Sequence, residues 1–280
     1  MILDGKKVRN ELLLFYEEKI KNESLKISLA IIYIGDDEPS KIYIKNKIKY
    51  CEKVGIKVIL YEMSAKTKEK EVIELIEKLN DSNDITGIIL QSPVPKQIDF
   101  SKCSSFIKPC KDIDGFTKEN LYKLVHNEPG LFPCTSKGII MLLKYYNITL
   151  AGKNVCIVGR GDIVGKPLIF EMLNNNATVT VCHSHTKNIS EFTKRADIVI
   201  SAVGSARLIK SNMVKDDAIV IDVGISVIDG KIVGDVDFDN LKDKCTYITP
   251  NPGGVGPMTI SMIIDNLIKA YYMQKESVNG

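Results

Sequence analysis

The sequence predicts an α/β protein of two domains, the second of which holds a doubly wound parallel sheet. Its 280 residues are about twice the length of an average domain. Apolar runs of strand length alternate with helical patterns in both halves, which favours parallel strands joined by crossover helices. Between residues 95 and 133 this alternation gives way to Pro, Lys, Asp and Gly. We expect functional loops and the crossing between the domains in that stretch.

In the first half, each expected element follows from its own pattern. Apolar residues recur at helical spacing near the N-terminus, in a segment that ends at Gly55, and again after residue 70. Compact apolar runs, halted by Gly or Pro, predict strands. The expected strands are residues 27–34, 57–61 and 85–90, and the expected helices are residues 8–20, 40–54 and 72–79.

The second half repeats the alternation after two helical segments. A short helix is expected at residues 120–125 and a longer one at 136–146. The strands of one doubly wound sheet are expected at residues 154–158, 177–182, 197–203 and 218–223. A last helix, at about 258–274, follows a segment rich in Gly and Pro.

The composition excludes several classes of protein. Hydrophobic residues make up 44% and charged residues 26% of the chain, and the net charge is +3. These values argue against a mainly disordered chain and against nucleic-acid binding. Apolar runs are too short for a membrane span, and Asp4 and Lys6 interrupt any signal-peptide core. Seven cysteines without a Cys-x-x-Cys pair fit buried thiols in a reducing compartment, so we expect a cytoplasmic protein.

The turn after the first strand of the second half carries the strongest general signal. Gly159, Gly161 and Gly165 stand there between a strand and a helix that has Pro167 in its first turn. Glycines let the backbone approach a pyrophosphate, and the helix N-terminus stabilises the charge. The spacing is one residue longer than the usual fingerprint, and such a turn can also be purely structural. Four strands in the right alternation favour a Rossmann-type dinucleotide site.

The second strand of this sheet favours NADP over NAD. NAD sites usually place Asp or Glu about 20 residues after the glycines, to bind the ribose 2′-hydroxyl. Here the strand ends in Cys182, His183, Ser184 and His185, without a carboxylate. Arg160 and Ser184 could bind a 2′-phosphate, although Arg160 could instead be a solvated loop residue. No third ligand lies near the two histidines in sequence, so no metal site is expected.

Polar side chains line one face of the helix expected at residues 40–54. Ser40, Tyr43, Lys47 and Tyr50 fall at helical spacing. Such a stripe is either a solvated face or a set that places Lys47, partly desolvated, in a cleft where it can transfer protons.

Two further polar positions follow from strand ends and turns. Gln91 stands at the end of the strand expected at 85–90, directly after Leu90. Open α/β sheets place ligand contacts at such strand ends, although Gln91 could simply face water. Asp114 lies in an acidic turn at residues 111–116 that could equally be only a loop.

Taken together, these segments resemble the family of bifunctional methylenetetrahydrofolate dehydrogenase/cyclohydrolases over nearly the whole chain. The string Thr249-Pro-Asn-Pro-Gly-Gly-Val-Gly-Pro-Met-Thr259 is the most specific match, because so long a Pro/Gly string rarely recurs by chance. The other matching segments are residues 35–47, 87–95, 111–116, 133–135 and 158–167. The chain departs from the family pattern at Ser92, Ser136, Gly161 and Asn251.

The resemblance implies an activity and a cofactor. The enzyme would oxidise 5,10-methylenetetrahydrofolate with NADP⁺ and then hydrolyse the methenyl product to 10-formyltetrahydrofolate, within one-carbon metabolism and purine biosynthesis. Lys47 would transfer protons in the hydrolysis, Gln91 would hold and tune Lys47, and Tyr43 would stack on the aminobenzoate ring of the folate and help to orient Lys47.

The resemblance also implies further contacts with the substrate. Asp114 would accept hydrogen bonds from the amino edge of the pterin. Gly253 and Gly254 would line the cleft, and Ser40 belongs to the same substrate site. Gly159, Arg160, Gly161, Gly165 and Ser184 would bind NADP.

The resemblance finally implies a domain plan. Residues 1–118, completed by a C-terminal helix at 259–280, would form the catalytic domain, and residues 119–258 the Rossmann-type NADP domain, with a cleft between them. A homodimer would form through the NADP domains. Tetrahydrofolate derivatives would be its partners, with no nucleic acid, membrane or metal involved.

Two other classes of function remain open at this point. The first is another two-domain NADP oxidoreductase, similar to shikimate dehydrogenase, whose cleft would lack the set formed by Tyr43, Lys47, Gln91 and Asp114. The second is a sensor that binds a dinucleotide without catalysis. An assay of NADPH formation with methylenetetrahydrofolate separates all three.

Overall fold

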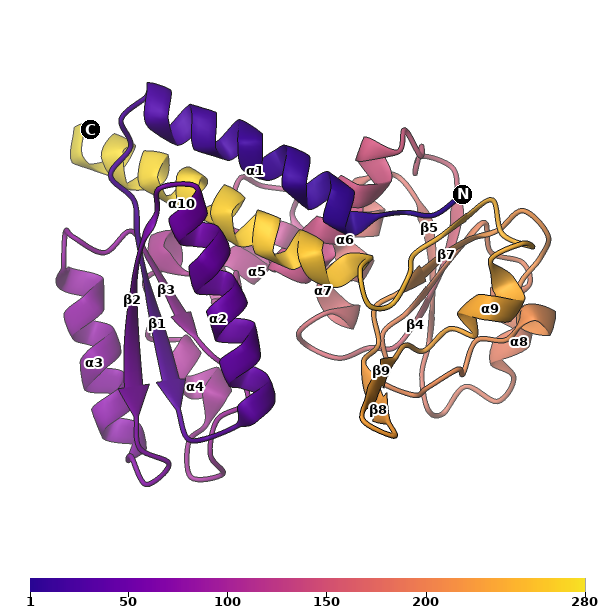
Figure 1. Cartoon of the computed structure of the whole chain (residues 1–280), viewed down its shortest axis with the longest axis horizontal. Helices are drawn as coiled ribbons and strands as arrows, with labels where there is room; N and C mark the ends of the chain where they lie inside the picture. Colours follow the sequence, from indigo (N-terminus) through magenta and orange to yellow (C-terminus); the bar gives the residue numbers. More distant parts are fainter. Residues whose placement is uncertain (280) are drawn as a thin grey trace. The chain divides into compact units, whose positions relative to one another are not determined.

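The computed structural model describes residues 1–279, with side chains up to residue 276, and shows two compact units (Figure 1). The first unit comprises residues 11–134 together with the chain from Ile260 onward. The second unit comprises residues 1–10 and 135–259. Both are α/β with parallel sheets, so the expected fold class is confirmed.

The first unit is built on a sheet of three parallel strands in the order β2-β1-β3. Its strands are β1 (Ser28–Ile34), β2 (Lys57–Met63) and β3 (Gly87–Leu90). Its helical elements are most of α1 (Gly5–Asn22), α2 (Glu38–Lys53), α3 (Glu69–Asp81), α4 (Phe100–Ser104), η1 (Pro109–Lys111), α5 (Lys118–Val125) and most of α10 (Val255–Asn279).

Both faces of the central strand in this unit are covered, which explains its uninterrupted apolar sequence. Ala30, Ile32 and Ile34 of β1 pack with α3 and α4 in one buried cluster. Beside β1, Gly87 of β3 lies so close to its neighbours that a Cβ atom would be 2.8 Å from Leu267 of α10. Every residue of β1 and β3 is buried, whereas the edge strand β2 is partly exposed.

The second unit contains a sheet of five parallel strands in the order β10-β7-β6-β4-β5. The strands are β4 (Asn154–Val158), β5 (Thr178–Cys182), β6 (Ile198–Ser201), β7 (Ile219–Asp222) and β10 (Tyr247–Ile248). The remaining elements are α6 (Cys134–Tyr145), α7 (Gly165–Asn174), α8 (Ile189–Thr193), η2 (Ser211–Met213), α9 (Phe238–Leu241) and the hairpin of β8 (Ser226–Ile228) and β9 (Lys231–Val233). Because β4 lies between β5 and β6, the winding of the sheet reverses there, and such a switch point is where these sheets bind ligands.

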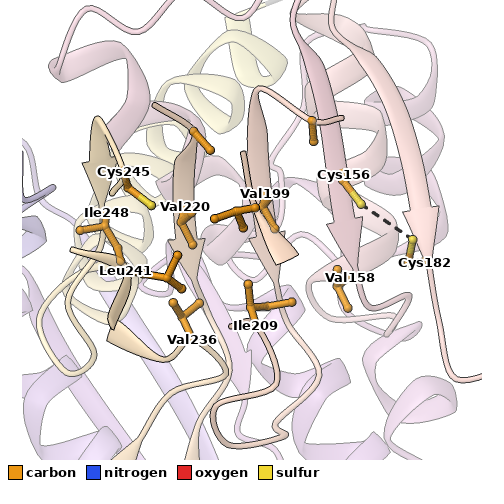
Figure 2. Packing of buried hydrophobic residues seen from close by; sticks show 13 residues of the cluster. Cys156, Val158, Cys182, Val199, Ile209, Val220, Val236, Leu241, Cys245 and Ile248 are labelled. Atoms are coloured by element: carbon orange, nitrogen blue, oxygen red, sulfur yellow. Dashed lines mark hydrogen bonds between the residues drawn. The ribbon is translucent and has the colours of Figure 1, made fainter. Parts of the chain in front are cut away.

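One face of this sheet is closed by a cluster of buried aliphatic and cysteine side chains (Figure 2). Val199, Val220 and Ile248 come from three neighbouring strands. The thiols of Cys156 and Cys182, on β4 and β5, lie 3.8 Å apart. Burial raises the pKa of both thiols, which keeps them protonated. All seven cysteines of the chain are free, and six of them are buried.

The expected strands are all present, but several short elements escaped the sequence analysis. The hairpin of β8 and β9 exposes Val227, Ile228 and Ile232, so it shows no apolar alternation. Strand β10 has only two residues. The short helices α4, α8 and α9 have five residues or fewer, which is too short to show a helical period. Within residues 1–279, no helix has both the length and the apolar run needed to cross a membrane.

The compact units are bounded near residues 10, 134 and 259, whereas the expected domain plan with bounds at 118 and 258 stays a prediction. The N-terminal residues pack with the second unit, where the backbone N–H of Leu3 donates to the carbonyl of Ile248 in β10 at 2.9 Å. The segment at 119–134 stays with the first unit. There Asn120 donates to the carbonyl of Pro109 at 2.9 Å, and Asn266 of α10 donates to that of Phe132, also at 2.9 Å.

Two buried aspartates hold the end of β7 to the segment that follows the hairpin. Asp222 is 3% exposed and Asp235 is completely buried. The carboxylate of Asp222 accepts hydrogen bonds from the backbone N–H groups of Asp235, at 2.9 Å, and Val236, at 3.2 Å. Burial is the main cause that raises the pKa of Asp222 to about 6, and the neighbouring Asp235 adds to it.

This raised pKa predicts a specific dependence of stability on pH. Between about pH 4 and 6 the folded state binds the Asp222 proton more tightly than the unfolded state, so the free energy of unfolding should fall as pH rises. An Asp222→Asn variant lacks this proton. As pH rises across this range, the free energy of unfolding of the variant should therefore increase relative to that of the wild type by up to about 3 kcal/mol. This is the free energy that corresponds to a pKa of about 6 instead of 3.8. Urea unfolding of both proteins at several pH values measures the difference, and parallel curves would contradict the prediction.

Candidate active site

Lys47 lies in the middle of α2 and is only 5% exposed. Its Nζ donates to Oε1 of Gln91, directly after β3, at 3.0 Å. Gln91 is 8% exposed, and its own Nε2 donates to the carbonyl of Ser92 at 2.6 Å, which fixes the amide with its oxygen toward Lys47. A buried ammonium group is costly without a hydrogen-bond partner. Lys47 therefore does not belong to a solvated face, and Gln91 supplies its partner.

The start of α2 explains how Lys47 reaches this position. Asp37 caps the helix, because its Oδ2 accepts from the backbone N–H of Ser40 at 2.9 Å and from the Ser40 hydroxyl at 2.6 Å. The buried residues Ser40, Ile44, Lys47 and Cys51 then recur at helical spacing. Lys47 thus shares its face with apolar anchors, and Ser40 holds the capping residue Asp37 through its hydroxyl group.

Tyr43 lies one helical turn before Lys47 and is partly exposed. The Nζ atom of Lys47 is 5.8 Å from the centre of the Tyr43 ring, within the range of a cation–π contact. The ring therefore helps to define the position of the ammonium group and keeps an accessible surface.

The two aspartates of the turn at 111–116 have different surroundings. Asp112 is buried and accepts from the backbone N–H groups of Gly115, at 2.9 Å, and Thr117, at 2.7 Å, so it holds the turn. Asp114 remains partly exposed. Burial is the main cause that raises the pKa of Asp114, while the charge of Lys47 lowers it and that of Asp112 raises it. The charge of Lys47 therefore acts on Asp114 within the same unit.

The glycine turn after β4 has the close contacts that a dinucleotide site needs. Gly159 has a φ of +123°, and a Cβ atom there would lie 2.5 Å from the carbonyl oxygen of Ala202. A Cβ atom on Gly165, at the start of α7, would lie 2.7 Å from the carbonyl oxygen of Gly159. Gly161 has open space around it, and Arg160 is exposed. The first turn of α7 contains no acidic residue.

Ser184 lies beyond the end of β5, in a turn next to these glycines. The backbone N–H of Gly159 donates to the carbonyl of Cys182 at 2.9 Å, which joins the two strand ends. Thr186 closes the turn, because its N–H donates to the carbonyl of His183 at 2.8 Å. Ser184 is exposed within this turn. Among residues 1–279, no group of three His, Cys, Asp or Glu side chains could hold a metal ion.

Gly253 and Gly254 form a tight turn in the second unit. Gly253 has a φ of +121°, and the N–H of Gly254 donates to the carbonyl of Pro250 at 2.8 Å. A Cβ atom on Gly254 would lie 2.6 Å from the Cβ of Thr249. Only glycine fits at these two positions.

The structure thus separates the candidate residues into two groups. Ser40, Tyr43, Lys47, Gln91 and Asp114 share the first unit. The second unit carries the other candidates, which are Gly159, Arg160, Gly161, Gly165, Ser184, Gly253 and Gly254. The sequence analysis missed the buried Asp222 and Asp235. Asp222 ends an apolar strand, much as Gln91 comes directly after one, and that pattern could have revealed it.

Two family models match consecutive parts of the chain. The model of the tetrahydrofolate dehydrogenase/cyclohydrolase catalytic domain matches residues 3–114. The model of the tetrahydrofolate dehydrogenase/cyclohydrolase NAD(P)-binding domain matches residues 133–275.

Individual proteins match over the full length. The bifunctional protein FolD of Lactobacillus helveticus is 49% identical over 278 residues, which cover 98% of this chain and 99% of that protein. The crystal structure of the FolD methylenetetrahydrofolate dehydrogenase/cyclohydrolase from Campylobacter jejuni has 41% identity and a TM-score of 0.96, with 98% of this chain and 99% of that chain covered. The Trypanosoma brucei enzyme, solved with NADP and an inhibitor, has 32% identity and a TM-score of 0.93, with 100% and 99% covered.

Proposed function

The chain belongs to the tetrahydrofolate dehydrogenase/cyclohydrolase family, and on this premise we propose that it is a bifunctional enzyme of folate metabolism. It oxidises 5,10-methylenetetrahydrofolate to 5,10-methenyltetrahydrofolate with NADP⁺, and it hydrolyses this product to 10-formyltetrahydrofolate. The hydrogen bond of 3.0 Å between the buried Lys47 and Gln91 is the observation that carries the second activity.

Hydrolysis requires three proton movements. Water adds to the methenyl carbon and loses one proton, which leaves a hydroxyl group on that carbon. The hydroxyl then loses its proton as the bond from the carbon to a ring nitrogen breaks and the nitrogen gains one, so that one proton is released overall. Lys47 carries protons in a site partly shielded from solvent, and Gln91 accepts only one of its three N–H donors. Gln91 therefore orients Lys47 and leaves it N–H groups from which it can donate a proton, and the amine formed by that donation can accept a proton in return.

The residues of the glycine turn fit NADP. Gly159 and Gly165 pack against neighbouring backbone where no Cβ atom fits, and the first turn of α7 carries no acidic side chain that would repel a pyrophosphate. Arg160 and Ser184 are exposed and suit the 2′-phosphate, while Gly161 leaves the turn open. When bound, NADP⁺ accepts the hydride of the oxidation step.

The remaining candidates suit the folate. Asp114 is partly exposed, and the charge of Lys47 lowers its pKa, which favours the carboxylate form. A carboxylate can accept hydrogen bonds from the amino edge of the pterin. Tyr43 offers a ring face to the aminobenzoate group. Ser40 supports this helix through its hydrogen bonds to the capping residue Asp37. We assign the tight turn of Gly253 and Gly254, in the second unit, to the substrate as well.

The domain plan and the assembly are part of the same proposal. The catalytic domain corresponds to residues 1–118 with 259–280, and the NADP domain to 119–258. The enzyme works as a cytoplasmic homodimer, paired through its NADP domains, and its product supplies one-carbon units for purine biosynthesis. The exposed apolar side chains of Val227, Ile228 and Ile232 on the hairpin of β8 and β9 support a partner surface there.

Lys47→Met should separate the two activities. The variant keeps much of the side-chain bulk but removes its charge and its protons, so hydrolysis of methenyltetrahydrofolate should slow by about 10²–10⁴-fold. Hydride transfer needs no side chain to take a proton, so NADPH formation from methylenetetrahydrofolate should fall less. Both steps can be followed by absorbance. Lys45→Met, which removes an exposed charge from the same helix, should leave both rates near those of the wild type.

Three outcomes would contradict this account. Hydrolysis by folded Lys47→Met at the wild-type rate would exclude the proton-transfer role. A wild-type protein that binds NADP⁺ but forms no NADPH from methylenetetrahydrofolate would indicate a sensor. NADPH formation from another small substrate alone would indicate a different oxidoreductase.

Arg160→Ala should weaken NADP⁺ more than NAD⁺. A hydrogen bond to a charged phosphate contributes about 1.5–3 kcal/mol, which only NADP⁺ would lose. KM measurements with both cofactors check this prediction, and NAD⁺ serves as the internal control. Equal effects on the two KM values would show that Arg160 is a solvated loop residue.

Asp114→Asn should weaken folate binding alone. The change keeps the shape but turns one acceptor oxygen into a donor, which would face the donors of the pterin. The KM for methylenetetrahydrofolate should rise, while NADP⁺ binding measured by calorimetry stays unchanged. Loss of NADP⁺ binding by a folded variant would place this turn elsewhere.

A further inference from the structure

Both carboxylate oxygens of Asp235 accept hydrogen bonds from the end of β6 and from the turn that follows it. Its Oδ2 accepts from the Ser201 hydroxyl at 2.9 Å and from the backbone N–H of Val203 at 2.8 Å. Its Oδ1 accepts from the backbone N–H of Ser205 at 2.7 Å. One completely buried side chain thus fixes three positions of a segment about 30 residues earlier in the chain.

Neighbouring backbone leaves these carboxylates no room for a ligand. A Cβ atom on Gly224 would lie 1.9 Å from Oδ1 of Asp235, and one on Gly234 would lie 1.8 Å from Oδ2 of Asp222. Asp222 in turn accepts from the backbone N–H of Asp235. The two aspartates therefore serve the chain itself rather than a bound molecule.

Hydrophobic packing makes Asp235 a rigid support. The next residue, Val236, is buried, and Figure 2 shows its side chain among those of Val220, Leu241 and Ile209. The backbone N–H of Ile209 also donates to the carbonyl of Asp235 at 2.9 Å. Asp235 is thus fixed to the core of the sheet, and its hydrogen bonds set the position of the turn at 202–205.

This turn lies at the switch point of the sheet. The backbone N–H of Ala202 donates to the carbonyl of Val158, at the end of β4, at 2.8 Å. The carbonyl oxygen of Ala202 lies against Gly159, where a Cβ atom would be only 2.5 Å away. Parallel sheets of this winding bind dinucleotides in the crevice between these two strand ends. Val203, the next residue, is 42% exposed and available to a ligand.

We propose that Asp235 is a positioning residue of the dinucleotide site, whose buried carboxylate holds the turn at 202–205 beside the glycine turn so that it forms one wall of that site. The inference rests on the proposed function, because NADP is the dinucleotide in question. Asp222 assists Asp235 by accepting a hydrogen bond from its backbone N–H, which orients the backbone of Asp235. A purely structural role would instead affect stability without affecting the cofactor.

The test compares Asp235→Asn with a matched variant at the opposite edge of the sheet. The asparagine keeps the size of the side chain but replaces one acceptor oxygen by an NH₂ group facing donors of the turn. The dissociation constant for NADP⁺, measured by calorimetry, should rise about tenfold to a hundredfold. The KM for NADP⁺ should rise more than kcat falls, and cofactor-free hydrolysis of methenyltetrahydrofolate should stay near the wild-type rate.

Asp197→Asn is the control. Asp197 precedes β6, accepts from the backbone N–H of Asn154 at 2.8 Å and forms an ion pair with Lys215. It ties the amino ends of β4 and β6, whereas Asp235 holds the carboxyl end of β6 and the turn that follows it. The control should lower the melting temperature and leave the dissociation constant for NADP⁺ unchanged. Lower melting temperatures for both variants, with wild-type affinity for NADP⁺ in both, would overturn the inference.

Ser201→Ala keeps the proposal testable if Asp235→Asn does not fold. This variant removes a single O–H donor to Asp235 and should raise the dissociation constant for NADP⁺ about twofold to tenfold. An unchanged constant would overturn the inference. The titration needs no folate, so a wild type that binds NADP⁺ without oxidising methylenetetrahydrofolate would overturn the proposed function alone.

Discussion

The parallel direction of the strands is the constraint on which both units depend. Parallel strands all end at one edge of their sheet, and helices cover the faces, so polar groups can gather only where the strands stop. Gln91 follows β3 in the first unit. In the second unit Gly159 follows β4, and Asp222 ends β7. Each candidate at a strand end is therefore placed by the sheet rather than by its own loop.

Buried charges at these edges differ in how completely the chain satisfies them. The three donors to Asp235 occupy both of its oxygens, which suits a support. Among the described residues, Gln91 is the one hydrogen-bond acceptor that the structure gives to the Lys47 ammonium group. An ammonium group has three donors, so Lys47 retains hydrogen-bonding capacity for substrate or water. The same principle of satisfying buried polar groups thus distinguishes a supporting residue from a reactive one.

The sequence predicted those elements whose burial leaves a local pattern of apolar residues. The strands around Ile31 and Ile157 are continuous apolar runs because both faces of their sheets are covered. The stripe of Lys47 was visible, but its burial was not, since Lys47 faces the core together with Ile44 and Cys51. The hydrogen bonds of Asp235, which join segments about 30 residues apart, follow no local period. The hydrogen bond from Asn266 to the carbonyl of Phe132 joins residues more than 130 positions apart and was equally hidden.

Asn251 shows how one buried support reaches a second turn. Its Nδ2 donates to the carbonyl of Gly224 at 2.6 Å, and its side chain also hydrogen-bonds to Asp222. Gly253, two residues later, lies in the tight turn that the proposed function assigns to the substrate. Asp222 therefore has two links. Through Asn251 it is connected to the turn of Gly253, and through the backbone N–H of Asp235 it is connected to the residue that holds the turn at 202–205. Because residues that share one hydrogen-bond network do not respond independently, substitutions at Asp222 act on both turns at once.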